Sequence, residues 1–323
     1  MLQGLGRAEI DVIVREQGAV EVTCEVCIAD IDSMRSLKVV KPARETARGP
    51  CCTMDNPVMN DKDFEAARSA LVDARGRARA LPQWPISRYP EDLHEAYRLQ
   101  TAVIEAFGPI GAWKVGAITA EQQRTMGLAS PVAGPIPASL FRDSRAGPAS
   151  FRFAEFIAPL IECEFAFELG RDLPVRADAA YTRDEVAAAT AALRIAIELV
   201  DPRLPRGSGA LAELADGFNN GAFIAGPRIE AWQDLDFAKI DIVVTSGGDG
   251  ERSEVARGNG RAILGGDPFG AVVLLANAQP PGRGLRAGDV VTTGSCTGAP
   301  ALPGPGRYLA EFAGLGVVEL RLD

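Results

Sequence analysis

The sequence predicts an α+β fold, in which short strands of mixed direction are flanked by helices. Apolar runs with the two-residue period of strands and amphipathic runs with a helical period follow one another irregularly, and not as repeated β-α-β units. Glycine (34 residues) and proline (22 residues) are abundant, which favours a chain rich in strands and turns. The 323 residues, 47% of them hydrophobic, suffice for one large domain or two smaller ones, and no internal repeat is visible.

An irregular extension, residues 1–58, precedes a regular region, residues 59–323. Three interpretations of the extension compete. Residues 9–27 resemble the tail of the redox-regulated, zinc-binding heat-shock chaperone, and Cys24, Cys27, Cys51 and Cys52 could form a local zinc site. The third interpretation is a non-functional extension, which we favour because the second cysteine pair is adjacent and the chain between the pairs is irregular.

The regular region divides into helices and strands at its turn-forming residues. Residues 120–150 carry many turn signals and predict a loop. Thr182-x-x-Glu185 is a capping box, which marks a helix start. The periodicity predicts helices at residues 63–80, 90–107, 182–192 and 268–277, and strands at residues 111–116, 159–170, 193–200, 240–246, 289–293 and 317–322.

Two glutamates interrupt the apolar strand Pro159-Leu-Ile-Glu-Cys-Glu-Phe-Ala-Phe-Glu-Leu-Gly170. Because side chains alternate along a strand, Glu162 and Glu164 point to one side while Ile161, Cys163 and Phe165 point to the other. Two neighbouring carboxylates on a half-buried strand require a partner. A divalent metal ion is one such partner, so this pair is the first indication of a metal site.

Glu198 is a third carboxylate in an apolar run, Leu193-Arg-Ile-Ala-Ile-Glu-Leu-Val200. Three carboxylates brought together form an oxygen-rich site suited to Mg²⁺ or Mn²⁺, which keep positions open for substrate oxygens. From these residues alone, solvated glutamates at strand ends are an equally good interpretation.

Five motifs in order resemble one enzyme family. They are Trp113-Lys-Val-Gly116, Ile161 to Leu173, Ile197-Glu-Leu-Val-Asp-Pro-Arg-Leu204, Leu214-Ala-Asp-Gly-Phe-Asn-Asn-Gly-Ala-Phe223 and Leu285-Arg-Ala-Gly-Asp-Val-Val-Thr-Thr-Gly-Ser295. Together they resemble the 2-keto-4-pentenoate hydratase and 2-oxo-3-hexenedioate decarboxylase family of the fumarylacetoacetate hydrolase superfamily, from about residue 60 to the C-terminus. The resemblance implies a mixed β-roll or barrel flanked by helices, of the type of that superfamily's C-terminal domain, and a metal-dependent homo-oligomer.

The resemblance also implies roles for individual residues. Glu162, Glu164 and Glu198 are the expected ligands of Mg²⁺ or Mn²⁺, and Lys114 is the expected lysine beside the metal. We expect Asp216 and Asn220 to act in catalysis. Asn219, Thr293, Gly294 and Ser295 are expected to bind the substrate, the last three through backbone N–H groups offered to its carboxylate.

The expected reaction is the metal-dependent hydration of a 2-keto-enoic (2-hydroxydienoic) acid to a 4-hydroxy-2-keto acid, in the catabolism of aromatic compounds. A 2-keto acid chelates a divalent ion through its carboxylate and keto oxygens, and the ion stabilises the enolate. The alternatives are a 2-oxo-3-hexenedioate-type decarboxylase, an acylpyruvate-type C–C hydrolase, or an altered homologue that only binds a keto acid.

Two departures from the family pattern bear on these alternatives. His94, the only histidine, lies among acidic residues on the solvent side of a predicted helix, so the hydrolase, which would use a histidine to activate water, is disfavoured. Pro131-Val-Ala-Gly134 stands where the family has Pro-Asp-Phe-Gly, so an acidic residue is missing at Val132. Two interpretations stay open: a divergent lid that serves a different substrate, or an altered activity.

Composition excludes several other classes of protein. The net charge of −9 and the scattered basic residues disfavour nucleic acid as a partner. No apolar run is long enough to cross a membrane, and the first residues lack the pattern of a signal peptide. We expect a cytoplasmic enzyme whose partners are a small 2-keto acid and further copies of itself.

Overall fold

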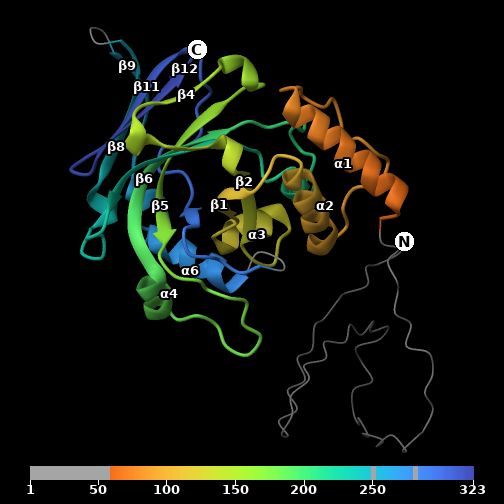
Figure 1. Cartoon of the computed structure of the whole chain (residues 1–323), viewed down its shortest axis with the longest axis horizontal. Helices are drawn as coiled ribbons and strands as arrows, with labels where there is room; N and C mark the ends of the chain where they lie inside the picture. The colour runs from red at the N-terminus through yellow and green to blue at the C-terminus, as the bar shows by residue number, and fades with distance from the viewer. Residues whose placement is uncertain (1–58, 249–251, 279–282) are drawn as a thin grey trace, which may run out of the picture. The chain divides into compact units, whose positions relative to one another are not determined.

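The computed structural model describes residues 59–248, 252–278 and 283–323 (Figure 1). The extension at residues 1–58, with its candidate zinc ligands, lies outside the described residues. Within these ranges the α-helices are α1 (Asp61–Gly76), α2 (Leu93–Glu105), α3 (Ala120–Met126), α4 (Arg183–Ala189), α5 (Ala210–Ala215) and α6 (Pro268–Ala278). None of them is long and apolar enough to cross a membrane.

The strands of the described chain form two mixed sheets. The larger has the order β2-β1-β10-β5-β6-β7-β3, and the smaller has the order β4-β12-β11-β8-β9. The strands are β1 (Ile110–Gly116), β2 (Val132–Pro137), β3 (Phe141–Asp143), β4 (Ala149–Phe151), β5 (Leu160–Leu169), β6 (Thr190–Val200), β7 (Asn220–Ile229), β8 (Asp241–Gly247), β9 (Arg252–Asn259), β10 (Val290–Thr292), β11 (Gly306–Phe312) and β12 (Gly316–Leu322).

The two faces of the larger sheet differ in the side chains they carry. One face packs against α6 and the smaller sheet through large apolar residues such as Phe165, Phe167 and Phe269. The other, here called the inner face, carries small residues such as Ala112, Ala166 and Ala196, together with the glutamates. The sheet is curled, since the Asn220 side chain at the start of β7 donates to the carbonyl oxygen of Pro135 on β2. The inner face therefore has room for a polar site.

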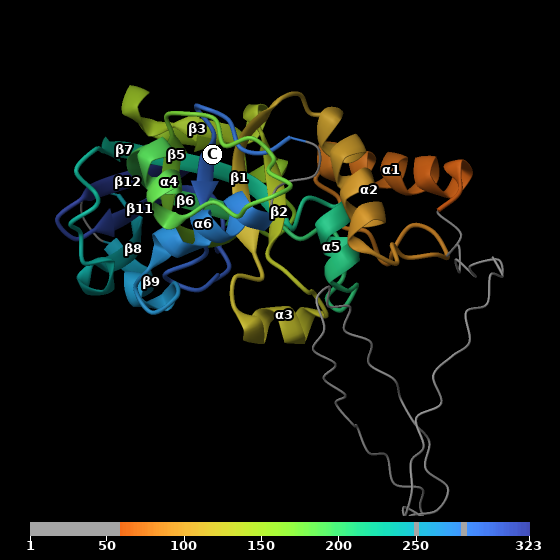
Figure 2. The ribbon, with the colours of Figure 1, turned by 90° about the horizontal axis from the view of Figure 1, so that it is seen from below.

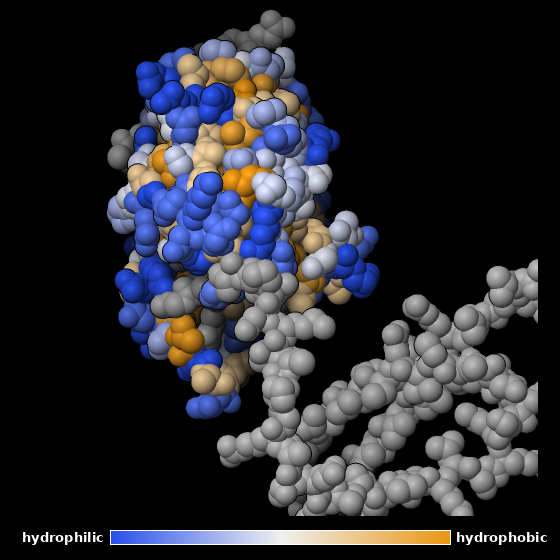
Figure 3. All heavy atoms as spheres, turned by 90° about the vertical axis from the view of Figure 1, so that its right-hand side faces the viewer, coloured by the Kyte–Doolittle hydropathy of each residue, from blue (hydrophilic) through white to orange (hydrophobic). Residues whose placement is uncertain are grey.

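Helices α1, α2 and α5 lie together beside the β2 edge of the larger sheet (Figure 2). They enclose a separate apolar cluster that contains Leu71, Trp84 and Leu99. On the side of the molecule where α1 lies, hydrophilic residues cover much of the surface and small apolar patches lie between them (Figure 3). These helices matter for the site because the turn between α5 and β7 reaches Lys114 on β1.

The mixed α+β prediction is confirmed, and so are the predicted strands at residues 111–116, 159–170 and 193–200. The capping box at Thr182 and Glu185 is also present. The predicted loop at residues 120–150 is wrong, because it contains α3, β2, β3 and β4. Its glycines and prolines lie within or between very short strands, whose partners are distant in sequence. The predicted helix at residues 182–192 ends at Ala189, where β6 begins at once.

Candidate metal centre and active site

Glu162, Glu164 and Glu198 come together on the inner face of the larger sheet. Strands β5 and β6 are antiparallel, and their register places Glu162 directly opposite Glu198. Glu164 follows two residues further along β5, so it points to the same face. One carboxylate oxygen from each residue lies within 4.8 Å of the other two. The alternation that predicted two neighbouring carboxylates thus yields three once the strands pair.

Lys114 supplies a positive charge to this cluster. It lies on β1, and its Nζ donates to Oε1 of Glu198 over 2.6 Å. The aliphatic part of its side chain passes Gly134 on β2, where an added Cβ would lie 2.7 Å from Cγ of Lys114. Glycine at position 134 therefore makes room for the lysine.

The cluster is buried and carries more negative than positive charge. Glu164 and Glu198 are 1% and 0% exposed and Lys114 is 7% exposed, so solvent screens little of the repulsion. Burial raises the pKa of Glu162 to about 7, against the attraction of Lys114 and together with the repulsion of Glu198. Burial, Glu198 and Glu162 raise the pKa of Glu164 well above its usual value. Without a further cation Glu162 and Glu164 therefore tend to hold protons.

Lys114 responds to the same charges in the opposite direction. Burial alone lowers the pKa of its ammonium group, but Glu198 and Glu162 outweigh this and raise the pKa above its usual value. Lys114 is therefore protonated at neutral pH, so three carboxylates face one ammonium group.

The donor set fits a divalent metal ion that prefers oxygen. Oε2 of Glu198 is buried and accepts no hydrogen bond, so it is free to bind an ion. Its other oxygen is held by Lys114. The three carboxylates leave the remaining coordination positions to water and substrate, as Mg²⁺ and Mn²⁺ require.

The segment Thr293-Gly294-Ser295 lies directly beside the carboxylates. The backbone N–H groups of Thr293 and Gly294 donate to Oε2 of Glu164 over 3.0 and 2.8 Å. The Ser295 hydroxyl donates to the carbonyl of Gly298. In this structure the two N–H groups orient the Glu164 carboxylate, and the expectation that they bind the substrate carboxylate stays a prediction.

Asp216, Asn219 and Asn220 belong to one turn between α5 and β7, at the edge of the site. The Asp216 carboxylate is fully buried and pairs with Nε of Arg203 over 2.8 Å. The Asn220 side chain is buried too, and it accepts a hydrogen bond from Arg75 over 2.6 Å. Asn219 is partly exposed, and its Oδ1 accepts no hydrogen bond. Oδ1 of Asp216 also accepts no hydrogen bond, so Asn219 and Asp216 each retain a free acceptor. The roles of Asp216, Asn219 and Asn220 stay predictions.

Residues that the sequence did not single out complete the surroundings of Lys114. The Phe218 ring centroid lies 5.6 Å from Nζ of Lys114. Glu213, on α5, lies close enough for the Lys114 charge to affect it, although burial outweighs this and raises the pKa of Glu213. Phe218 and Glu213 stand in or beside the motif at residues 214–223, but nothing in the sequence tells which of its side chains reach the lysine.

The chain is similar to several characterised enzymes. A 2-keto-4-pentenoate hydratase from Paraburkholderia phymatum is 33% identical over 208 residues, which are 64% of this chain and 75% of the relative. The 2-keto-4-pentenoate hydratase 2 of Dechloromonas aromatica is 32% identical over 261 residues, 79% of this chain and 95% of that enzyme. No protein-family profile matches the chain.

The chain belongs to the 2-keto-4-pentenoate hydratase family. This confirms the resemblance to the fumarylacetoacetate hydrolase superfamily, and it makes the chain a lyase of the hydratase type. The fold agrees: 4-oxalocrotonate decarboxylase from Pseudomonas putida G7, solved with magnesium and adipate, aligns with a TM-score of 0.68 at 22% identity. That alignment covers 82% of this chain and 99% of the decarboxylase.

Val132, the position of the missing acidic residue, lies in β2 and not in a lid loop. It pairs with Gly116 of β1, and its side chain is fully buried against Ala96, Ala117 and Leu214. The expectation of a divergent lid at residues 131–134 is therefore wrong. The cause is strand pairing with β1, which turn-forming residues alone do not reveal.

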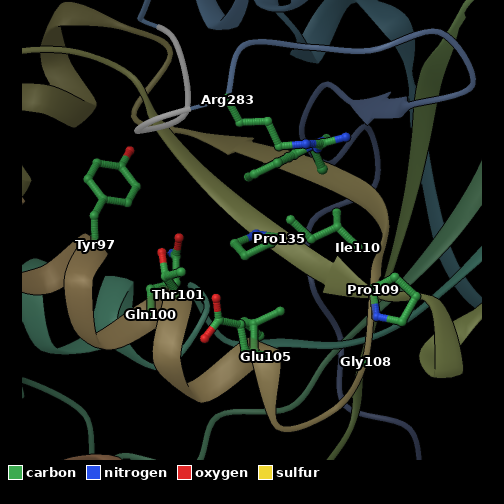
Figure 4. Close-up of a pocket in the computed structure, with 11 residues that line it drawn as sticks. Tyr97, Gln100, Thr101, Glu105, Gly108, Pro109, Ile110, Pro135 and Arg283 are labelled. Atoms are coloured by element: carbon green, nitrogen blue, oxygen red, sulfur yellow. The ribbon is translucent and has the colours of Figure 1, made fainter.

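A cavity of about 330 Å³ lies on the face of β1 that is opposite to Lys114 and the glutamates (Figure 4). Trp113 and Pro135 line it, and because neighbours on a strand point to opposite faces, Lys114 points away from it. Arg283 and Glu105 lie at opposite sides of its opening (Figure 4). The cavity is thus distinct from the glutamate cluster.

Proposed function

We propose that this enzyme is a Mg²⁺- or Mn²⁺-dependent hydratase that converts a 2-hydroxydienoic acid, or its 2-keto-enoic tautomer, to a 4-hydroxy-2-keto acid in the catabolism of aromatic compounds. The convergence of Glu162, Glu164 and Glu198 beside Lys114 carries this proposal. It is supported by similarity to relatives that are named 2-keto-4-pentenoate hydratases. The proposed enzyme acts on a small molecule and assembles with copies of itself.

Glu162, Glu164 and Glu198 would hold the ion. A 2-keto acid would chelate the bound ion through its carboxylate and keto oxygens, and the ion would polarise the keto group as a Lewis acid. Glu164 is oriented for this role by the two N–H groups of Thr293 and Gly294. Glu198 is oriented by Lys114.

Lys114 would stabilise negative charge and take part in proton transfer during the reaction. Ketonisation of the dienol removes the proton of the 2-hydroxyl group and adds a proton at C5, the other end of the diene. Water then adds to the double bond that is conjugated with the keto group. The Lys114 ammonium group, buried beside Glu198, stabilises negative charge that develops on the substrate enolate. Asn219, with its free Oδ1, is the proposed acceptor for the attacking water.

Decarboxylation of a 2-oxo-3-hexenedioate is the second candidate. It is favoured by the similarity to 4-oxalocrotonate decarboxylase from Pseudomonas putida, which is 26% identical over 240 residues, 72% of this chain and 87% of that enzyme. The same enolate stabilisation supports loss of CO₂ when the substrate carries a second carboxylate. The acylpyruvate hydrolase has less support, because His94 is exposed on α2.

Product analysis separates these reactions. Metal-stripped enzyme is incubated with 2-hydroxypenta-2,4-dienoate and with 2-oxohex-3-enedioate, with and without added Mg²⁺ or Mn²⁺. We expect 4-hydroxy-2-oxopentanoate from the dienoate only when the ion is present. Release of CO₂ from the enedioate with no hydrated product from the dienoate would establish the decarboxylase instead. If neither substrate reacts, binding of pyruvate or oxalate by the inactive protein would identify an altered homologue that only binds a keto acid.

A further inference from the structure

The turn between α5 and β7 has an unusual backbone. Gly217, Phe218 and Asn219 all have positive φ, at 78°, 58° and 60°. Glycine adopts this left-handed conformation readily, but Phe218 and Asn219 do so at a cost of about 1–2 kcal/mol each. A turn of this kind persists only if the surrounding structure holds it.

Arg75, near the end of α1, joins the two ends of this turn. Its Nη2 donates to the carbonyl oxygen of Asp216, before the turn, over 2.7 Å. Its Nη1 donates to Oδ1 and to the carbonyl oxygen of Asn220, after the turn, over 2.6 and 3.3 Å. One planar guanidinium group therefore binds both ends at once, which the single charged nitrogen of a lysine would not reproduce.

Arg75 occupies this position against an electrostatic cost. Its side chain is 4% exposed, and burial together with the nearby Arg203 lowers its pKa to about 9. Two guanidinium groups here share the carboxylate of Asp216, whose Oδ1 lies 3.9 Å from Nη2 of Arg75, and the attraction of Asp201 does not make up for the burial of Arg75. A buried cation so incompletely paired is costly for stability alone, which points to a role in shaping the turn.

The turn between α5 and β7 also contacts Lys114. Phe218 covers the face of Gly116, where an added Cβ would overlap its ring, and the ring lies beside the Lys114 ammonium group. The Gly217 carbonyl oxygen lies 3.0 Å from where a Cβ on Gly134 would stand, next to the Lys114 side chain. The turn is therefore one wall of the space that fixes the lysine side chain.

We infer that Arg75 is a positioning residue for the hydratase site: it holds the Asp216–Asn220 turn in its left-handed conformation, and the turn fixes Lys114 against Glu198. The effect of Arg75 on catalysis rests on the proposed function. Its effect on the turn does not. Arg75 makes no hydrogen bond or ion pair with Glu162, Glu164 or Glu198, and in this proposal it does not touch the substrate.

The test compares Arg75→Lys and Arg75→Met with Leu71→Ala. Leu71 lies one helical turn earlier on α1 and is fully buried in the apolar cluster, so its loss weakens the same helix without touching the Asp216–Asn220 turn. We expect kcat on the dienoate to fall by up to about 100-fold in Arg75→Met, as misplacement of a reacting group does, and by less in Arg75→Lys. The dissociation constant for Mn²⁺, measured by calorimetry, is expected to stay unchanged in both, and Leu71→Ala is expected to keep the wild-type kcat below its unfolding temperature.

Two results would overturn the inference. One is an Arg75→Met enzyme whose kcat matches that of Leu71→Ala, and the other is a loss of Mn²⁺ binding in parallel with kcat. If Arg75→Met does not fold, Arg75→Lys carries the same comparison. If the wild-type enzyme does not hydrate the dienoate, the proposed function fails, and a crystal structure of the Arg75 variant decides the inference by itself. An unchanged turn, with Phe218 still beside Lys114, would then refute it.

Discussion

The inner faces of β5 and β6 carry carboxylates at both ends, and the two ends balance them in different ways. At the end proposed to bind the ion, here called the metal end, Glu162, Glu164 and Glu198 face one ammonium group, that of Lys114. At the other end, here called the arginine end, Glu168 binds Arg194 over 2.9 Å and Arg228 over 3.4 Å, and Asp143 binds Arg194 and Arg145.

This difference shows what distinguishes a metal site from an ion-pair network built on the same strands. Arg194 is as buried as Glu164 and Glu198, at 1% exposed, and it bridges two carboxylates. The arginine end thus satisfies its carboxylates with guanidinium groups and needs no ion. The metal end has an excess of negative charge and a buried glutamate oxygen with no partner. The metal end and the arginine end therefore differ in how many cationic side chains face their carboxylates.

The largest expected effect follows removal of a charge from the metal end. Glu198→Gln takes away a ligand and leaves the Lys114 ammonium group without its partner. We expect Mn²⁺ affinity to fall by more than about 100-fold, beyond the range typical of residues that only orient a ligand, and turnover to be lost. Calorimetry with Mn²⁺ measures the affinity, and full affinity in the variant would remove Glu198 from the metal site.

Replacing the cation of the metal end separates metal binding from chemistry. Lys114→Met leaves three carboxylates without an ammonium group, so we expect Mn²⁺ to bind at least as tightly as in the wild type. We expect kcat to fall by about 10²–10⁴-fold, as loss of a proton-transfer group does. An enzyme with weakened Mn²⁺ binding and unchanged kcat would contradict both expectations.

The arginine end predicts an effect on stability instead of metal binding. Arg194→Met leaves Glu168 and Asp143 with fewer partners, and we expect the free energy of unfolding to fall by about 3 kcal/mol, at the low end for a buried pair because both carboxylates are partly exposed. Urea denaturation measures this. Arg228→Met, which removes a more exposed partner of Glu168, is the matched control and should cost less than about 1 kcal/mol. Loss of Mn²⁺ affinity in Arg194→Met would mean that the two ends are not independent.

The two ends also predict opposite responses to pH. Burial raises the pKa of Glu162 from 4.5 to about 7, so the metal-free fold binds this proton more tightly than the unfolded chain does. Glu162 therefore makes the metal-free fold more stable as the pH falls from about 7 to 4.5, and Mn²⁺ affinity should weaken over the same interval.

At Asp143 the stability depends on pH in the opposite direction. Burial alone would raise its pKa, but Arg145 and Arg194 hold it below its usual value. Its contribution to stability is present at neutral pH and is lost as the pH falls through the lowered pKa. Unfolding of metal-free wild type and Asp143→Asn across this range separates the two contributions. Equal pH dependence in both proteins would contradict the role of Asp143.

The smallest effect is expected outside both ends. His94 is exposed on α2, so His94→Ala should leave kcat, metal affinity and stability unchanged. Steady-state kinetics and thermal unfolding measure this. A loss of activity would revive the hydrolase, which would need a histidine.

The sequence by itself determined the metal end. The period of two in residues 159–170 placed Glu162 and Glu164 on one face, and the motifs at Trp113 and Ile197 supplied Lys114 and Glu198. The structure brings these side chains together, and their placement was predictable because strand alternation is local and the motifs are continuous in the chain. Their roles as ligands and as the catalytic lysine stay predictions. The family follows from the same motifs.

Only the tertiary structure decided how the rest of the inner face is used. Glu168 has the same alternation as Glu162, yet Arg194 binds it from β6 and also binds Asp143 of β3, which makes Glu168 part of an ion-pair network. Val132 is in a strand because β1 pairs with it, and Asp216 is held by Arg203. In each case the partner comes from another segment of the chain, so burial and counter-charge were set by tertiary contacts and not by the local residues.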